Sequence, residues 1–229
     1  GRDNHERHRL LVETCASKRP SWVTLQNVTA ADDLEEAFAQ VGLGHWTYNS
    51  TSRLAIASRY QLTPPPQHMN SHPFILARRI IIAEKEFLVG SVTLESGLSE
   101  ESTRLLQASL LTTVAQQNQE RYPTTPFLVG GEWNSRETAR TVRFLNGLDV
   151  GSEGESTFWE VLSKSKWRNP LGVPHNFGTF HSANKNTHSS ILLHGSLDYW
   201  QGVRVGAGNL HHASKEPFSV SALWTQVCF

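Results

Sequence analysis

The sequence is poor in several features that define particular classes of protein. Its 229 residues include two cysteines, Cys15 and Cys228, near opposite ends of the chain, which offer neither the spacing of a zinc site nor a disulfide framework. No apolar run approaches the roughly 20 residues that a membrane helix needs. The first residues, Gly1 to Arg9, lack the apolar core of a signal peptide. We therefore expect a soluble, intracellular protein with no membrane partner.

Net charge and aspartate are also scarce. Lys plus Arg and Asp plus Glu both number 21, which removes the usual electrostatic sign of a nucleic-acid-binding protein. Only five of the acidic residues are aspartate. The charge is uneven, however, because residues 1–160 carry 15 basic and 19 acidic groups, whereas residues 161–229 carry 6 and 2. The last third also holds six of the 11 histidines, so it is the part of the chain that would meet RNA or another acidic partner.

The amino-acid composition of the chain is typical of a single folded domain. With 38% hydrophobic and 18% charged residues, the chain has enough apolar side chains for a core. It contains no internal repeat and no long low-complexity tract, and its one marked breaker, Pro64 to Pro66, predicts a loop between two strands. We predict a single domain over residues 1–229.

Helical and strand patterns alternate along the chain. Helices are expected over residues 7–17, 32–41, 99–119, 137–145 and 156–162. The third has Ser99 as its expected N-cap and an apolar stripe of Leu105, Leu106, Leu110, Leu111 and Val114. Strands are expected over residues 22–28, 54–58, 74–83, 87–94 and 126–129, with a turn at Glu84 to Glu86. This mixture predicts an α/β fold with a layered sheet and outer helices.

The order of seven short segments carries a resemblance to a known family. The segments are Pro20–Val28 (PSWVTLQNV), Ala55–Tyr60 (AIASRY), Phe87–Glu95 (FLVGSVTLE), Phe127–Ser135 (FLVGGEWNS), Thr179–His181 (TFH), Ser196–Trp200 (SLDYW) and Ser214–Val220 (SKEPFSV). They resemble, in order, the "LQE", "SR", "THLD", "GDFN", "TFH", "IDY" and "SDH" motifs of the endonuclease/exonuclease/phosphatase superfamily. The resemblance begins at about Glu6, so the first strand of that family is missing or lies before residue 1. It implies the deoxyribonuclease-I-like fold, a four-layered α/β sandwich with two central mixed β-sheets flanked by helices.

The resemblance also implies where a metal site would lie. In active members one or two Mg²⁺ ions hold a phosphate ester while a base activates water. Mg²⁺ requires anionic oxygen ligands. The chief ligand, the Glu of "LQE", is replaced here by Asn27, and the Asp of "GDFN" by the longer Glu132, with Asn134 retained. The His and Asp of "THLD" are Thr93 and Glu95.

The terminal motif departs furthest from the family. Lys215 and Glu216 stand where active members have Asp and His, and a lysine with a pKa near 10.4 is a poor base at neutral pH. Asp198 is retained, with an expected role in orienting its neighbours. We expect Lys215 to place its ammonium near the former metal position and Trp133 to fill space meant for substrate. The pattern implies a vestigial pocket with no catalytic residue, no metal ligand and no cofactor.

Three functions are consistent with this pattern. The first is a catalytically inactive structural or assembly subunit of a larger complex, for example a mitochondrial ribonucleoprotein, with protein partners and with RNA bound by residues 161–229. The second is a divergent Mg²⁺-dependent phosphodiesterase or nuclease. It would use Glu132, Asn134, Asp198, Glu216 and a residue before Gly1, and it is the one function of the three that requires Mg²⁺. The third is a protein inhibitor or adaptor that binds no nucleic acid.

Overall fold

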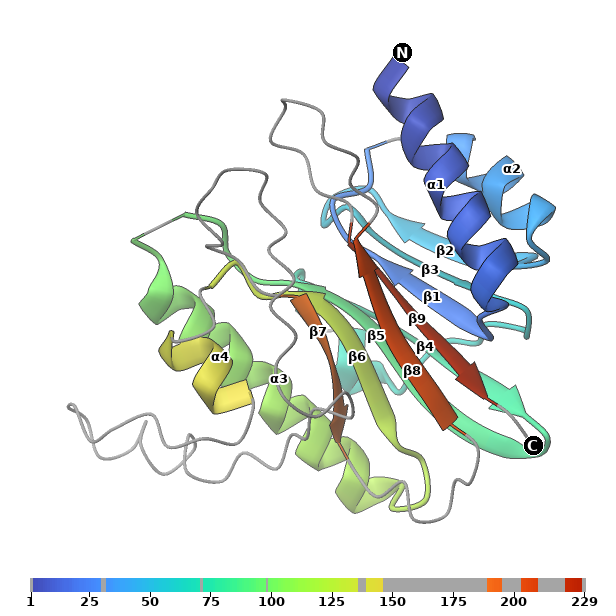
Figure 1. The fold of residues 1–229 in the computed structure, drawn as a ribbon. Helices are drawn as coiled ribbons and strands as arrows, with labels where there is room; N and C mark the ends of the chain where they lie inside the picture. The colour runs from blue at the N-terminus through green and yellow to red at the C-terminus, as the bar shows by residue number, and fades with distance from the viewer. Residues whose placement is uncertain are drawn as a thin grey trace, which may run out of the picture.

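Helices and strands alternate through the chain, as the sequence predicts (Figure 1). The computed structural model describes residues 2–29, 32–70, 72–97, 99–135, 139–145, 189–194, 203–209 and 221–227. Its elements are α1 (Arg2–Lys18), β1 (Trp22–Leu25), α2 (Asp32–Gln40), β2 (His45–Asn49), β3 (Leu54–Ser58), η1 (Gln67–Asn70), β4 (Ile75–Ile82), β5 (Lys85–Thr93), α3 (Glu101–Arg121), β6 (Phe127–Glu132), α4 (Arg140–Leu145), β7 (Ser189–His194), β8 (Val203–Asn209) and β9 (Ser221–Val227). The helix expected over residues 156–162 lies outside the described residues.

The strands form two sheets. Sheet A has five strands in the order β2-β3-β1-β9-β8, and sheet B has four in the order β4-β5-β6-β7. Every described pair in sheet A is antiparallel, whereas sheet B is mixed because β5 and β6 run parallel. The long helix α3 supplies the crossover that a parallel pair requires.

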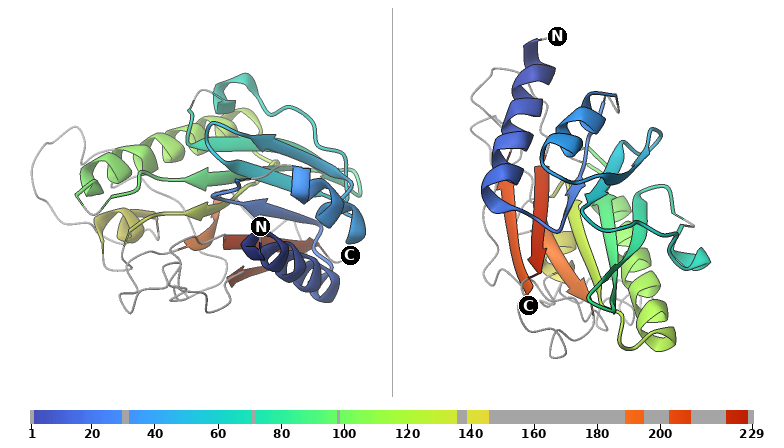
Figure 2. Two further views of the ribbon diagram at one scale, coloured as in Figure 1. Left: turned by 90° about the horizontal axis from the view of Figure 1, so that it is seen from above. Right: turned by 90° about the vertical axis from the view of Figure 1, so that its right-hand side faces the viewer.

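The two sheets pack face to face, and helices cover both outer faces. Figures 1 and 2 show α1 and α2 on sheet A, and α3 and α4 on sheet B. Three clusters of buried apolar side chains fill the three spaces between these layers. One contains Leu11 and Phe38 under α1 and α2, the second joins Trp22 to Phe87 between the sheets, and the third includes Leu111 of α3. The expected four-layered α/β sandwich is confirmed.

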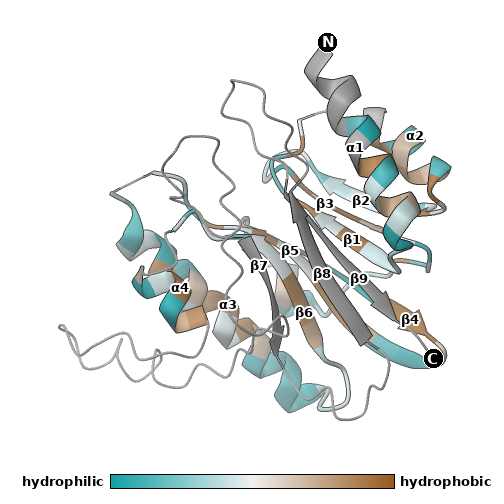
Figure 3. Cartoon of the chain, in the orientation of Figure 1, coloured by the Kyte–Doolittle hydropathy of each residue, from teal (hydrophilic) through white to brown (hydrophobic). Residues whose placement is uncertain are grey.

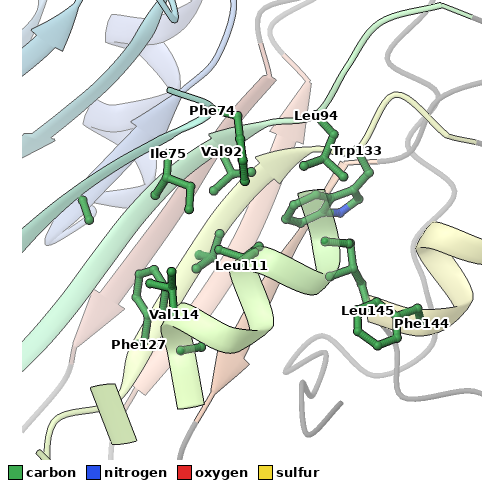
Figure 4. Packing of buried hydrophobic residues seen from close by; sticks show 14 of the residues in the cluster. Phe74, Ile75, Val92, Leu94, Leu111, Val114, Phe127, Trp133, Phe144 and Leu145 are labelled. Carbon is green, nitrogen blue, oxygen red and sulfur yellow. The ribbon is translucent and has the colours of Figure 1, made fainter. Parts of the chain in front are cut away.

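Side-chain alternation gives β6 two chemically different faces. Phe127 and Val129 pack toward α3 and α4 together with Trp133, which follows the strand (Figure 4). Leu128 belongs to the cluster between the sheets, on the same face as Glu132. The expectation that Trp133 fills the vestigial pocket is therefore wrong, because its ring lies on the opposite face of sheet B from Glu132.

Two strand predictions differ from the structure. The sequence does not predict β2, an edge strand whose side chains are exposed or only partly buried, so it lacks the apolar pattern of a core strand. The turn between β4 and β5 lies at Ala83 and Glu84, one residue earlier than expected. Both residues have positive φ, 47° and 65°, as in the two-residue hairpin turns that match the twist of the flanking strands. In contrast to β2, the predicted strands β4 and β6 do carry hydrophobic residues along their length (Figure 3).

The buried face of α3 is more polar than the expected leucine stripe. Leu106 is 50% exposed, whereas Thr112 and Asn118 are buried. Thr112 Oγ1 donates to the Ala108 carbonyl at 2.9 Å, and Asn118 Nδ2 donates to the Thr125 carbonyl at 3.2 Å, so both donors are satisfied, whereas Asn118 Oδ1 is buried without a hydrogen-bond partner in the described structure. The N-cap position is held by Glu100 rather than Ser99, with no side-chain cap hydrogen bond. No helix among the described residues is long and apolar enough to span a membrane.

Gly131 of β6 has no room for a side chain. A Cβ atom there would collide with the ring of Trp133, which is fully buried. We expect Gly131→Ala to lower the free energy of unfolding, measured in urea, by about 1–3 kcal/mol through overpacking. The matched control is Gly44→Ala, where nothing lies within 4 Å of the added methyl group. Equal losses in the two variants would contradict this account of the packing.

Candidate functional site

The space between the sheets changes from apolar to polar toward one end. Near its middle, the rings of Trp22 and Phe87 pack across the two sheets, with their centroids 5.8 Å apart. Beyond them, where β1 and β6 end, polar side chains from both sheets meet. The first of these is Gln26, the residue after β1, which is fully buried. The sandwich thus becomes polar at the ends of these two strands.

Gln26 links the two sheets through buried hydrogen bonds. Its Nε2 donates to Ser91 Oγ at 2.9 Å and to the Gly130 carbonyl at 3.3 Å, and Ser91 Oγ donates to the Leu25 carbonyl at 2.9 Å. The donor of the Gln26 amide is thus satisfied, while its Oε1 is buried without a hydrogen-bond partner in the described structure. This bridge therefore fixes the end of β1 against β5 and β6. The sequence-derived site omits Gln26, although it lies within the motif-like segment that ends β1.

Asn27 and Glu132 form the centre of the site. Asn27 Nδ2 donates to Glu132 Oε2 at 2.5 Å, and Glu132 is only 1% exposed. The backbone of Asn27 is in the left-handed region, with φ of 57°, which asparagine tolerates better than most residues. Because a carboxylate buried to this degree requires hydrogen-bond donors, the Asn27 amide stabilises Glu132 directly. The structure thus brings together two of the residues that the sequence singles out.

Thr93 borders this pair. It is the register partner of Glu132 across the parallel strands β5 and β6, and strand alternation places it on the same face as Ser91. Its hydroxyl-bearing side chain is only partly buried. A threonine at this position can offer a hydrogen bond to a neighbour, but no imidazole.

Glu95 and Asn134 belong to loops beside the site rather than to its centre. Glu95 is exposed, and its backbone N–H donates to Gln107 Oε1 at 2.8 Å. Asn134 has φ of 48°, and its Nδ2 donates to the Leu94 carbonyl at 2.8 Å. Asn134 therefore ties the turn after β6 to the end of β5. The remaining expected residues, Asp198, Lys215 and Glu216, lie outside the described residues.

The described part of the site does not fit the Mg²⁺ centre that the resemblance implies. Among the described side chains, no three His, Cys, Asp or Glu residues gather as metal ligands. Asn27 turns its N–H donor, not its oxygen, toward Glu132. A cation beside this oxygen of Glu132 would face that donor, whereas Mg²⁺ requires converging anionic oxygens. The absence of a metal from the whole site stays a prediction, because three expected residues lie outside the described part.

A second carboxylate, Glu101, holds the adjoining loops. Its Oε2 accepts from Arg104 Nε at 3.1 Å and from Ser135 Oγ at 2.9 Å, and its Oε1 accepts from the Thr141 N–H at 2.8 Å. Arg104 Nη1 also donates to the Gly97 carbonyl. Burial tends to raise the pKa of Glu101, but the hydrogen bonds from Thr141, Ser135 and Arg104 together lower it. The network joins the segments that follow β5 and β6.

Several solved structures are similar to this one. The human Nocturnin catalytic domain, solved with bound sulfate, is 14% identical, with a TM-score of 0.60 over 97% of this chain and 87% of its own. A humanized D. rerio TDP2 is 14% identical, with a TM-score of 0.61 over 98% and 93%. The beta toxin of Staphylococcus aureus is 10% identical, with a TM-score of 0.60 over 98% and 93%. No protein-family model and no curated protein matches the chain. At these identities the likeness is one of fold.

The Asn27–Glu132 hydrogen bond can be tested by replacing the amide with a second carboxylate. Asn27→Asp would set a second carboxylate against Glu132, and two such groups cannot both ionise without cost. We expect a loss of about 1–3 kcal/mol in the free energy of unfolding near neutral pH. Because the folded pair would bind a proton that the unfolded chain releases, stability should return as the pH falls. Urea denaturation across pH measures both effects.

The matched control is the double variant Asn27→Asp with Glu132→Gln. It restores one amide and one carboxylate in the opposite order, so most of the lost stability should return. A double variant as unstable as Asn27→Asp alone would contradict a direct interaction between the two side chains.

The Glu101 network predicts an acid-dependent loss of stability. A carboxyl group with a lowered pKa in the folded state contributes stability above its unfolded pKa of about 4.3, and this contribution is lost as the pH falls through the lower folded pKa. We expect Glu101→Gln to be less stable than the wild type near neutral pH, and the difference to shrink in acid. A difference that stays constant over the acid range would contradict the lowered pKa of Glu101.

Proposed function

We propose that this chain, whose fold is the deoxyribonuclease-I-like fold of the endonuclease/exonuclease/phosphatase superfamily, is a catalytically inactive protein that serves as a structural or assembly subunit of a larger complex. The observation that carries this proposal is the hydrogen bond from Asn27 to the buried carboxylate of Glu132. This bond gives the buried carboxylate a hydrogen-bond donor from within the protein. We therefore expect the site to be stable without a bound metal ion.

Other residues of the site point in the same direction. Thr93 provides no imidazole beside Glu132, and Asn134 binds a backbone carbonyl instead of facing Glu132. In the sequence, Lys215 and Glu216 replace the terminal Asp and His of active members. Catalytic groups that act as a unit do not leave activity in proportion to the groups that remain. Loss of several functions at one site therefore supports an inactive protein more strongly than any single replacement.

The charge distribution supports a partner that is acidic. Residues 161–229 carry 6 basic and 2 acidic groups, together with six histidines, whereas residues 1–160 are net acidic. Basic surface supplies most of the affinity of a protein for a phosphate backbone. We infer that RNA, within a ribonucleoprotein such as a mitochondrial one, is the acidic partner, and that protein partners meet the rest of the surface.

One observation favours the alternative of a divergent Mg²⁺-dependent phosphodiesterase. Glu132 keeps an acidic group, buried at the end of β6, where active members of the superfamily have an acid. The similar solved structures include one described as a catalytic domain, that of Nocturnin. Under this alternative Mg²⁺ would bind at Glu132, and Asn27 would have to turn its oxygen toward the ion.

A hydrolysis assay distinguishes the inactive subunit from the Mg²⁺-dependent phosphodiesterase. The purified chain, incubated with Mg²⁺ or Mn²⁺ and labelled RNA, DNA or a simple phosphodiester, should show no hydrolysis above that of buffer. Glu132→Gln should leave this background unchanged. Metal-dependent hydrolysis that disappears in Glu132→Gln would overturn the inactive assignment.

The native mass tests the assembly role. On a density gradient of gently lysed cells, the protein should migrate far above its own 25.6 kDa, and nuclease treatment should release it if RNA holds it in place. Migration as a free monomer would contradict a subunit role. A heavy complex that survives nuclease would assign the contact to protein rather than RNA.

A further inference from the structure

Arg78 places a charge on the inner face of a sheet. It lies on β4, where Leu76, Ile80 and Ile82 belong to the apolar cluster between the sheets. Because side chains two residues apart along a strand share a face, Arg78 faces sheet A together with these three residues. β4 and β2 are edge strands of their sheets, so Arg78 stands at the open edge of this space.

The hydrogen bonds of Arg78 leave its charge uncompensated within the described structure. Its Nη1 donates to the Ala77 carbonyl at 2.8 Å, and its Nη2 donates to Thr47 Oγ1 of β2 at 2.8 Å. Both acceptors are neutral, and the described residues give Arg78 no carboxylate partner. Its neighbour Arg79, on the other face of the strand, pairs with Glu86 at 3.2 Å. Burial lowers the pKa of Arg78, which reflects the cost of holding this charge away from water.

A pocket of about 400 Å³ opens beside this guanidinium. Tyr48, Asn49 and Ser50 line it from the end of β2, and His72 lines it from the segment before β4, together with Arg78 itself. Its volume lies within the range of small-molecule sites in proteins. No acidic side chain is among the described residues that line it. The pocket therefore combines one positive charge that has no described carboxylate partner with a lining of polar residues and three apolar ones.

Two groups of the lining, an amide nitrogen and a hydroxyl group, can donate hydrogen bonds to a ligand. Asn49 Oδ1 already accepts from the N–H groups of Thr51 and Ser52, at 3.0 and 3.1 Å, so its amide nitrogen is the group left to bind a ligand. The exposed Ser50 adds a hydroxyl group. The side chain of Tyr48 lies on the other face of β2, where it packs against the cluster under α1 and α2 and donates its hydroxyl to the Val28 carbonyl at 3.1 Å, so it offers no donor to a ligand.

We propose that this pocket binds the phosphate group of a phosphate ester no larger than a mononucleotide. A guanidinium presents several N–H donors in a plane, which matches the oxygens of a phosphate better than a single point charge does. The anion would supply the negative charge that Arg78 lacks, with Asn49 and Ser50 as further donors. The pocket is separate from the Asn27–Glu132 site, because Asn27, Thr93 and Glu132 do not line it. It goes beyond the assembly role and does not depend on that role.

Thermal unfolding of the full chain tests this site. Inorganic phosphate and adenosine 5′-monophosphate should raise the melting temperature in proportion to their binding, and acetate at the same ionic strength should not. Arg78→Met should abolish the rise. The matched control, Arg79→Gln, removes a charge from the adjacent residue outside the pocket. The rise in melting temperature with phosphate should persist in this variant.

A gentler variant keeps the test decisive if Arg78→Met fails to fold. Asn49→Asp retains the oxygen that accepts from Thr51 and Ser52, but replaces the donor with a negative charge. Calorimetric titration with adenosine 5′-monophosphate should show at least a tenfold weaker affinity in this variant, whereas Arg79→Gln should bind like the wild type. An unchanged rise in Arg78→Met, an unchanged affinity in Asn49→Asp, an equal rise with acetate, or no rise with either phosphate compound would overturn the proposal.

Discussion

The carboxylate of Glu132 is buried between the two sheets, and the polar end of the sandwich is organised around it. Strand alternation along β6 directs Leu128 and Glu132 toward sheet A while Phe127 and Val129 pack under α3. A buried carboxylate must find a cation or hydrogen-bond donors. Asn27 supplies a donor, and the buried hydrogen bonds of the preceding residue hold the end of β1 close enough for it to do so.

The side chains behind sheet B make this arrangement rigid. Trp133 closes against Gly131 on the far face of β6, and the Glu101 network joins the loops that leave β5 and β6. The site residues that lie in these loops, Glu95 and Asn134, bind backbone or neighbouring side chains rather than each other. Hydrogen bonds within the protein thus engage the described polar groups at the ends of β1, β5 and β6.

Much of this structure is predictable from sequence, and the failures have physical causes. The long apolar patterns predict the core strands and α3, and the ordered motifs predict the four layers and the proximity of Asn27 and Glu132. The edge strand β2 is not predicted from the sequence because it lacks an apolar pattern. Trp133 is misplaced because the expectation rests on its position next to Glu132 in the sequence, whereas successive residues along a strand point to opposite faces. Arg78 gives no sequence signal at all, since the meaning of its charge depends on which face of β4 it occupies.

The most direct test of the account is the thermal unfolding of the wild-type chain with and without Mg²⁺. If the Asn27 amide satisfies Glu132 in place of a cation, Mg²⁺ should leave the melting temperature unchanged at constant ionic strength. A clear, saturable rise with Mg²⁺ that disappears in Glu132→Gln would show that the ion binds at this carboxylate, and would contradict the account.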